Sequence, residues 1–304
     1  MTAPVFRFAP SPNGDLHLGH ALSALTNQEM AASVGGRLLL RIEDIDVARC
    51  NPEFEAAIHR DLGWLGIAYE EPVRRQSEHF AEYEAALEQL KKDQLVYPAF
   101  MSRGEIRAAI MEHEATGQSW PRDPDGAPVY PGADKEMSKR ERRRRIDAGA
   151  PFAWRLDTAA ALAQLNGPLS WYEWTDEAMG GVSEIAADPL QWGDVIIARR
   201  EIATSYHLSV VVDDALQGVS HVVRGKDLYF ATSVQRLLQQ ALGLPKPGYF
   251  HHRLVLGPDG RKLSKSQRDT GLAALREAGE TPGTVKAMLG RRASDWTHKG
   301  RSSS

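Results

Sequence analysis

Two short motifs, far apart in the chain, carry side chains that can bind phosphate. The first is HLGH at residues 17–20, which follows a stretch rich in proline and glycine. The second is KLSKS at residues 262–266, which follows a turn sequence at 258–260. Imidazole, ammonium and hydroxyl groups all donate hydrogen bonds to phosphate oxygens. Either motif alone is weak, but together they predict a site that holds a nucleoside triphosphate from two sides.

The first motif is expected to lie at the junction of a strand and a helix. Residues 5–9 alternate in the two-residue period of a strand, and the prolines and glycine within 10–14 end it. A helix is predicted from about 16 to 34, with Asn13 or Asp15 as its N-terminal cap. The motif would then occupy the first turn of that helix.

The composition of this turn suits a triphosphate. His17 and His20 are three residues apart and therefore lie on one face, and the N-terminus of a helix has free N–H groups and a positive dipole end. Gly19 lets a purine ring or a ribose approach the backbone closely. The alternative is that the two histidines cap an ordinary helix. With the second motif in the same chain, we favour ATP binding by His17, Gly19 and His20.

The second motif is predicted to be a cationic loop on a hairpin. The turn at 258–260 joins two extended stretches, and Arg261, Lys262 and Lys265 follow it. Such a loop can stabilise the negative charge that moves onto a departing pyrophosphate. The alternative is a solvated basic hairpin. We predict that Lys262 and Lys265 act together with His17 and His20 in catalysis, and that Lys265 also contacts ATP.

The sequence around both motifs resembles the class I aminoacyl-tRNA synthetases, and within them the glutamyl branch. The segments that carry this resemblance are 8–20, 41–46 and 221–227, and the similarity extends from about residue 5 to about residue 290. The resemblance implies a ligase that activates L-glutamate with ATP and Mg²⁺ to glutamyl-adenylate. It also implies that activation proceeds without tRNA and that a tRNA is the partner.

The length of the chain limits which group on the tRNA we expect to receive glutamate. The chain has 304 residues, of which 38 follow Ser266, whereas a full glutamyl-tRNA synthetase continues into helical domains that read the anticodon. The chain is therefore similar to shortened paralogues that transfer glutamate to queuosine in the anticodon loop of tRNA(Asp). Two alternatives stay open: an enzyme that charges a tRNA 3′ end, and a catalytically silent RNA-binding paralogue.

Charge complementarity predicts a glutamate pocket, because glutamate brings two carboxylates and one ammonium group. Arg7 and Arg224 are each at the end of an expected strand and can bind a carboxylate through two hydrogen bonds, and Glu43 can take the ammonium. Which arginine holds the side-chain carboxylate is left open. The resemblance places glutamate binding at the same positions, and the full predicted set is Arg7, Ala9, Ser11, Glu43, Tyr206 and Arg224.

The predicted fold is α/β, with a Rossmann-like parallel-sheet nucleotide-binding domain, an inserted α+β subdomain and a short helical C-terminal part. The expected boundaries are 1–96 and 186–243 for the two halves of the catalytic domain, 97–185 for the insertion and 244–304 for the KLSKS loop, C-terminal part and tail. Beyond strand 5–9, the pattern predicts strands at 37–42, 194–198, 208–212 and 219–223 and helix from 52 to about 96.

Many relatives hold zinc in the insertion with cysteines at three positions. Here these positions carry Ala99, Met101 and Asp134, and the residues left cannot form a closed four-ligand zinc site. We therefore predict no metal site, and an insertion stabilised by apolar packing around Phe100 and Trp120.

Composition limits the remaining possibilities. A hydrophobic content of 42% predicts a large core, and the absence of a long apolar run or signal sequence predicts a cytoplasmic protein. We expect a monomer, although the sequence itself does not show the oligomeric state. Cys50 is the one cysteine, so no internal disulfide can form. The net charge is −3, so any RNA-binding surface must be local. The basic run at 139–145 could be that surface or an ordinary solvated helix face.

Overall fold

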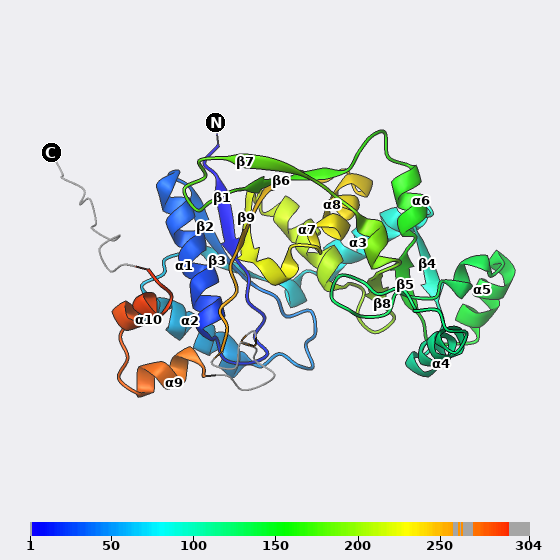
Figure 1. The fold of residues 1–304 in the computed structure, drawn as a ribbon, viewed down its shortest axis with the longest axis horizontal. Helices are drawn as coiled ribbons and strands as arrows, with labels where there is room; N and C mark the ends of the chain where they lie inside the picture. The colour runs from blue at the N-terminus through cyan, green and yellow to red at the C-terminus, as the bar shows by residue number, and fades with distance from the viewer. Residues whose placement is uncertain (1, 258–260, 262, 264–269, 292–304) are drawn as a thin grey trace. The chain divides into compact units, whose positions relative to one another are not determined.

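The computed structural model of the protein describes residues 2–257, 261, 263 and 270–291 (Figure 1). In this part of the chain the main sheet has seven strands in the order β3-β2-β1-β9-β10-β6-β7. β1 (Val5–Phe8) pairs in parallel with β2 (Arg37–Ile42), and β10 (Gly248–His252) pairs in parallel with β6 (Ser170–Trp174). β6 pairs antiparallel with β7 (Val182–Ala186). The predicted α/β class with a Rossmann-like, mainly parallel sheet is confirmed.

Contacts divide the chain into two compact units. The first contains residues 1–73, 223–226 and 252–304, and the second contains residues 74–222 and 227–251. The helices of the first unit are α1 (Leu18–Ser33), α2 (Pro52–Leu65), α9 (Leu272–Glu277) and α10 (Pro282–Met288). Those of the second are α3 (Phe80–Lys92), α4 (Arg103–Glu114), α5 (Lys139–Asp147), α6 (Thr158–Ala163), α7 (Tyr206–Leu216) and α8 (Thr232–Ala241).

The predicted strand–helix–strand start of the chain is present, but its helix cap differs. α1 begins at Leu18, and its N-cap is His17 rather than Asn13 or Asp15. The His17 backbone is extended, with φ −121° and ψ 178°, and its imidazole accepts the N–H of Gly19 at 3.1 Å. A ring nitrogen therefore satisfies a free helical N–H, a function more often performed by a carboxylate or hydroxyl.

The segment 52–96 is not helical throughout. α2 ends where Gly66 adopts a left-handed conformation, with φ 74°, and the N–H of Ile67 returns to the carbonyl of Leu62. The strand β3 (Glu70–Arg75) follows, and Pro72 within it could not occupy a helix interior. α3 then resumes the helical pattern. The periodicity is correct for two helices, and the glycine and proline signals between them mark the missed strand.

The predicted strand at 208–212 is wrong, because these residues form the centre of α7. Each residue from Leu208 to Asp214 is buried, so the helix has no polar stripe over this length and lacks the 3.6-residue period of an amphipathic helix. A run of three valines without that period resembles a strand. The buried carboxylate of Asp213 is satisfied by Arg74, Gln76 and Tyr83, with distances of 2.7–3.0 Å.

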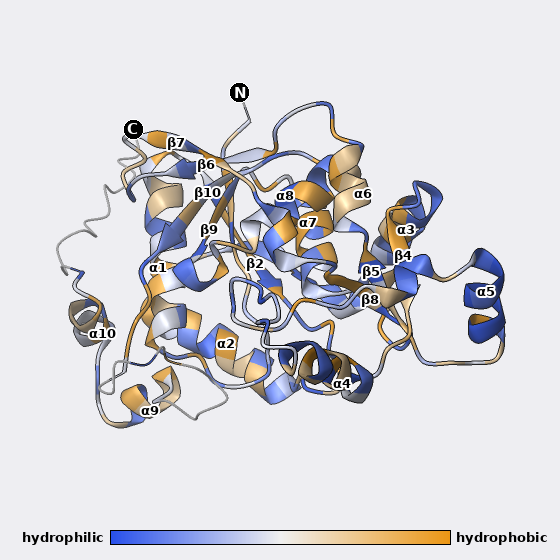
Figure 2. Cartoon of the chain, turned by 45° about the vertical axis from the view of Figure 1, so that its right-hand side comes forward, coloured by the Kyte–Doolittle hydropathy of each residue, from blue (hydrophilic) through white to orange (hydrophobic). Residues whose placement is uncertain are grey.

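A second sheet has three antiparallel strands in the order β4-β5-β8: β4 (Val96–Ala99), β5 (Ala153–Leu156) and β8 (Ile196–Arg199). The strand expected at 194–198 therefore exists, but it belongs to this sheet and not to the parallel one. The strand expected at 219–223 is β9 (His221–Gly225). Of the helices that follow β4, α5 is hydrophilic along its length (Figure 2). The domain limits expected from sequence stay a prediction.

Candidate active site

The HLGH motif forms a reciprocal cap at the start of α1. The Nδ1 atom of His17 accepts the Gly19 N–H, and the Nδ1 atom of His20 accepts the His17 N–H, each at 3.1 Å. The two ring centroids are 3.9 Å apart, and the rings are tilted by 44°. His17 is only 8% exposed. The sequence predicted that the two rings share a face, and the structure shows that they also cap the helix.

This cap fixes the protonation pattern of both rings. A nitrogen that accepts a hydrogen bond has no proton, so each neutral imidazole carries its proton on Nε2. Both Nε2 atoms are then hydrogen-bond donors, as contact with phosphate oxygens requires. Gly19 is under steric constraint, because a Cβ atom there would come within 3.0 Å of Cε1 and 3.1 Å of Nδ1 of His17. Capping and ligand binding are therefore compatible in this motif.

Three predicted pocket residues come from adjacent strands of the first unit. Glu43 directly follows β2, Arg7 lies in β1, and Arg224 lies in β9, which neighbours β1 on its other side. Arg7 and Arg224 are 4% and 5% exposed, and Nη1 of Arg7 is 3.5 Å from the carbonyl oxygen of Val223. The order β2-β1-β9 therefore places two buried arginines on adjacent strands and Glu43 at the end of the next strand.

The turns after β1 and β2 are joined by hydrogen bonds. The N–H of Glu43 donates to the carbonyl of Pro10 at 3.0 Å, and the N–H of Asn51 donates to the carbonyl of Pro12 at 3.0 Å. Ala9 and Ser11, both half-buried, lie in the first of these turns. Two predicted pocket residues therefore lie in a turn that is hydrogen-bonded to the backbone of a third, Glu43.

Two buried residues that sequence reasoning did not select support this arrangement. Nη2 of Arg41, which is fully buried, is 3.1 Å from Oε1 of Glu43 and orients that carboxylate. Nδ2 of Asn27 on α1 donates at 3.1 Å to Val223, whose carbonyl oxygen also accepts from Arg7. A buried arginine two residues before an acid in an apolar strand was a usable signal for Arg41. A polar residue on the inner face of α1 was the corresponding signal for Asn27.

Tyr206 is the first residue of α7, in the second unit, and its place in the pocket stays a prediction. Lys262 and Lys265 lie outside the described residues, as do Ser264 and Ser266. On either side of residues 258–260, the N–H of Gly257 donates to the carbonyl of Arg261 at 2.7 Å and that of Leu263 to the carbonyl of Val255 at 3.3 Å. This pairing is typical of the expected hairpin.

The chain that leaves the second motif is anchored beside the first. The N–H of Leu272 donates to the carbonyl of Leu16 at 2.7 Å, and Gly271 forms an antiparallel bridge with His17. A Cβ atom at Gly271 would lie 3.1 Å from Cβ of Asp15, so the approach is close. Residues 271–272, which follow the second motif in the chain, therefore lie beside the first motif, although the two are far apart in sequence.

In the second unit, the positions that correspond to cysteines in zinc-binding relatives are part of a small core. Ala99 packs with Tyr97 and Tyr130, and Met101 packs against them. Asp134 is 4% exposed and accepts hydrogen bonds from the N–H of Phe100, at 3.1 Å, and from the hydroxyl of Tyr130. Burial raises the pKa of Tyr130, and the hydrogen bond to Asp134 raises it further. A hydrogen-bonded carboxylate thus lies at one of the three positions.

The predicted aromatic residues also pack in this region. The ring of Phe100 lies 5.7 Å from that of Phe152, and Nε1 of Trp120 donates to the carbonyl of Val129 at 2.8 Å. No group of three or more potential metal-ligating side chains occurs among the residues described. The absence of zinc stays a prediction about the purified protein.

Comparison with known proteins defines the class to which this fold and this pair of motifs belong. Residues 5–302 match the family described as tRNA synthetases class I (E and Q), catalytic domain. The chain belongs to this family of ligases, whose members use ATP.

Individual relatives refine the comparison. The chain is 43% identical to the Glutamyl-Q tRNA(Asp) synthetase of Rhodobacter capsulatus, over 94% of this chain and 99% of the relative. It is 38% identical to the protein of the same name from Symbiobacterium thermophilum, of which it covers 84%. It is also 37% identical to Glutamate–tRNA ligase 2 of a Methylobacterium species, but it spans only 59% of that protein. The resemblance to the shortened glutamyl branch is thereby confirmed.

Solved structures agree with this assignment. A glutamate tRNA ligase from Elizabethkingia meningosepticum, in complex with its amino acid, matches 93% of this chain with a TM-score of 0.73 and 25% identity. The glutamate-tRNA synthetase of Elizabethkingia anophelis matches 88% with a TM-score of 0.71. The chain covers 59% and 54% of these two proteins. None of the described helices has the length and apolar character needed to cross a membrane.

Proposed function

We propose that the protein activates L-glutamate with ATP to glutamyl-adenylate without tRNA, and then transfers glutamate to queuosine in the anticodon loop of tRNA(Asp). The observation that carries the first half is the set of Arg7, Glu43 and Arg224 on adjacent strands, in the same unit as the HLGH turn. The names of the relatives that this chain matches over nearly their whole length support the second half.

The charges of the pocket select glutamate. Arg7 and Arg224 receive its two carboxylates, and Glu43, oriented by Arg41, receives its ammonium group. Ala9 and Ser11 add contacts from the first unit, and a contact from Tyr206 stays a prediction. Glutamine would leave one buried guanidinium facing an uncharged amide, and an unpaired buried charge costs about 3–5 kcal/mol. The pocket therefore discriminates by the charge of the substrate side chain.

Activation is an in-line displacement at phosphorus. The α-carboxylate oxygen of glutamate attacks the α-phosphorus of ATP, a new O–P bond forms, and the bond to pyrophosphate breaks. Because the carboxylate is already ionised, no general base is needed, and catalysis depends on positioning and charge stabilisation. His17 and His20 donate through Nε2 to the triphosphate, and Gly19 leaves room for the nucleotide. Lys262 and Lys265 bind the departing pyrophosphate. Mg²⁺ would enter with ATP, as part of the substrate, and would neutralise charge on the pyrophosphate oxygens.

Transfer follows from the mixed anhydride. A hydroxyl of the cyclopentenediol of queuosine attacks the glutamyl carbonyl, an ester bond forms, and AMP leaves. The competing proposal is esterification of a tRNA 3′ end, which the 37% identity with a glutamate–tRNA ligase favours. We prefer queuosine because the relative that is 43% identical, and is covered almost completely, has that specificity in its name.

Glutamate-dependent ATP–pyrophosphate exchange tests the activation step. Wild-type protein should catalyse exchange in the absence of tRNA, and Arg7→Ala should lower it by at least about 100-fold, since an unpaired charge that costs about 3–5 kcal/mol corresponds to roughly 10²–10⁴ in rate. Arg37→Ala is the matched control, because Arg37 starts the neighbouring strand but lies exposed in an ion pair with Glu70. Near-normal exchange by Arg7→Ala would remove Arg7 from the pocket.

A further inference from the structure

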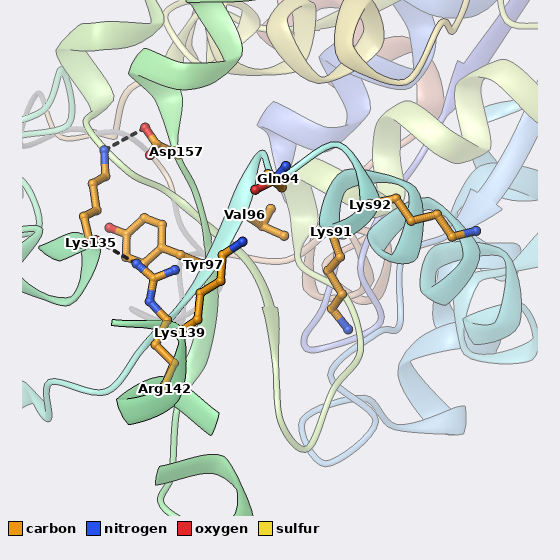
Figure 3. A pocket seen from close by; sticks show the side chains of 9 residues that line it. All are labelled: Lys91, Lys92, Gln94, Val96, Tyr97, Lys135, Lys139, Arg142 and Asp157. Carbon is orange, nitrogen blue, oxygen red and sulfur yellow. Dashed lines mark hydrogen bonds and ion pairs between the residues drawn. The ribbon is translucent and has the colours of Figure 1, made fainter. Parts of the chain in front are cut away.

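The second unit contains a cationic cavity that the proposed chemistry does not use. Its volume is about 470 Å³. Five cationic side chains and one carboxylate line it, and in Figure 3 they come from α3, from α5 and from the segments beside them: Lys91, Lys92, Lys135, Lys139, Arg142 and Asp157. We call this group the α3–α5 pocket. It lies within one unit, so its geometry is independent of the other unit.

Part of this positive charge is neutralised within the protein. Nζ of Lys135 lies 2.8 Å from a carboxylate oxygen of Asp157 and 2.8 Å from one of Asp194. Burial opposes the charge of Lys135, but these bonds outweigh it and raise its pKa. Lys91 pairs with Glu88 at 2.7 Å and lies over the ring of Trp154. These two lysines serve the structure of the unit.

The remaining three cations have no carboxylate partner among the residues that the structure describes. Nη2 of Arg142 donates only to backbone carbonyls, at 2.7 and 3.1 Å, and its buried Nε atom has no acceptor in the described part of the chain. Lys92 and Lys139 are exposed, and neither forms an ion pair with a described residue. In Figure 3 the Lys139 ammonium points into the space beside Val96, and Lys92 extends outward from α3.

The arginines further along α5 differ in this respect. Arg143 pairs with Asp147 at 3.0 Å, and Arg144 and Arg145 both pair with Glu141, at 2.7 and 3.0 Å. Within the described part of the chain, the charge of the basic run is therefore compensated at 143–145 and uncompensated nearer the start of the helix, where Lys139 and Arg142 line the pocket. The sequence alone would place the RNA-binding charge at the arginines 143–145, which the structure shows to be paired with carboxylates.

We propose that the α3–α5 pocket binds backbone phosphates of the tRNA, with Lys92, Lys139 and Arg142 as the contacting cations. The identity of the RNA rests on the proposed function. A polynucleotide suits this surface better than a small anion does, because two of the three cations are exposed on separate helices and can contact different phosphates of one chain. Such contacts fix the position of the RNA and carry no base specificity.

Two double variants, each of which removes two positive charges, test this proposal. Lys92→Ala/Lys139→Ala removes the uncompensated lysines, and Arg143→Ala/Arg144→Ala removes two compensated arginines from the same region. The dissociation constant for tRNA(Asp) is measured by fluorescence anisotropy between 50 and 200 mM salt, without ATP or glutamate. The lysine variant should bind about 10-fold more weakly and lose about 2 from the slope of log K against log salt, roughly 1 for each phosphate contact. The arginine variant should match wild type.

Controls separate this proposal from the proposed function. Both variants should keep wild-type ATP–pyrophosphate exchange, since none of the four side chains belongs to the first unit. Equal losses in the two variants would mean that only net charge matters, and an unchanged lysine variant would exclude the pocket; either result overturns the proposal. Inorganic phosphate that binds without displacing tRNA would reassign the pocket to small anions. A wild-type protein that binds tRNA but transfers no glutamate would instead refute the proposed function alone.

Discussion

Gly19→Ala separates helix stability from the positioning of an imidazole. In an ordinary helix, this substitution stabilises by up to about 1 kcal/mol, because alanine loses less conformational entropy than glycine. At Gly19, however, the new Cβ would lie 3.0 Å from Cε1 and 3.1 Å from Nδ1 of His17. The ring must move, and its bond with the Gly19 N–H must weaken. Loss of an N-terminal cap costs about 1 kcal/mol, so the two effects on stability nearly cancel.

The effect on activity should be much larger. His17 and His20 are coupled through the reciprocal cap, so displacement of one ring disturbs the other. The contact forces the His17 ring to give way by a few tenths of an ångström, and a shift of about 1 Å in a positioned group can cost about 100-fold in rate. We therefore expect glutamate-dependent ATP–pyrophosphate exchange to fall by about 10-fold, while the melting temperature changes by less than about 2 °C.

Gly63→Ala is the matched control. Gly63 lies within α2 of the same unit, and a Cβ atom there would meet nothing within 4 Å. This variant should melt about 2 °C higher, from the gain of about 1 kcal/mol, and should keep wild-type exchange. The reasoning fails if Gly19→Ala retains full exchange, or if Gly63→Ala loses activity to the same extent.

Three further predictions concern stability, pH and metal content. Arg276→Ala should destabilise the first unit by up to about 3 kcal/mol in chemical denaturation. In the wild-type protein the Arg276 guanidinium lies 2.5 Å from the fully buried Asp61 carboxylate, which the substitution leaves without this partner. The double variant Arg276→Ala/Asp61→Asn should recover part of the loss, and no recovery would refute this cause. Burial lowers the pKa of His221 below its usual 6.5, so the unfolded chain takes up the proton first and the unfolding free energy should fall as the pH drops below about 6.5. His221→Gln should flatten this decline, and an unchanged pH profile would count against it. Metal analysis should find far less than one equivalent of zinc, and EDTA should leave the melting temperature unchanged; stoichiometric zinc would contradict the substitutions at Ala99, Met101 and Asp134.

Sequence predicted the fold best where periodicity and local signals agreed. The strand at 37–42 was correct to the residue, and its parallel partner at 5–9 was correct to within one. The prediction at 208–212 failed because burial on all sides removes the pattern by which a helix is recognised. Membership of a sheet was also beyond the sequence, since the strand at 194–198 pairs with residues about 40 positions earlier in an antiparallel sheet.

At the candidate site, the sequence predicted the types of residue that are present but not how they are arranged. Charge requirements selected Arg7, Glu43 and Arg224, and the strand order supplies the adjacency that the sequence could not express. The reciprocal cap between His17 and His20 was not foreseen, because imidazole is an uncommon N-cap and its contribution depends on ring orientation. Arg41 was overlooked although its place in an apolar strand, two residues before Glu43, was a signal; its contact with the Glu43 carboxylate depends on the fold.

Transfer of radiolabelled glutamate to tRNA(Asp), with and without queuosine, is the most direct test of the proposed function. Both tRNAs have the same 3′ end, so they differ only in the acceptor that we propose. Wild-type protein with ATP should label the queuosine-containing tRNA and leave the other unlabelled. Equal labelling of the two tRNAs would show that the 3′ end is the acceptor and would contradict the account.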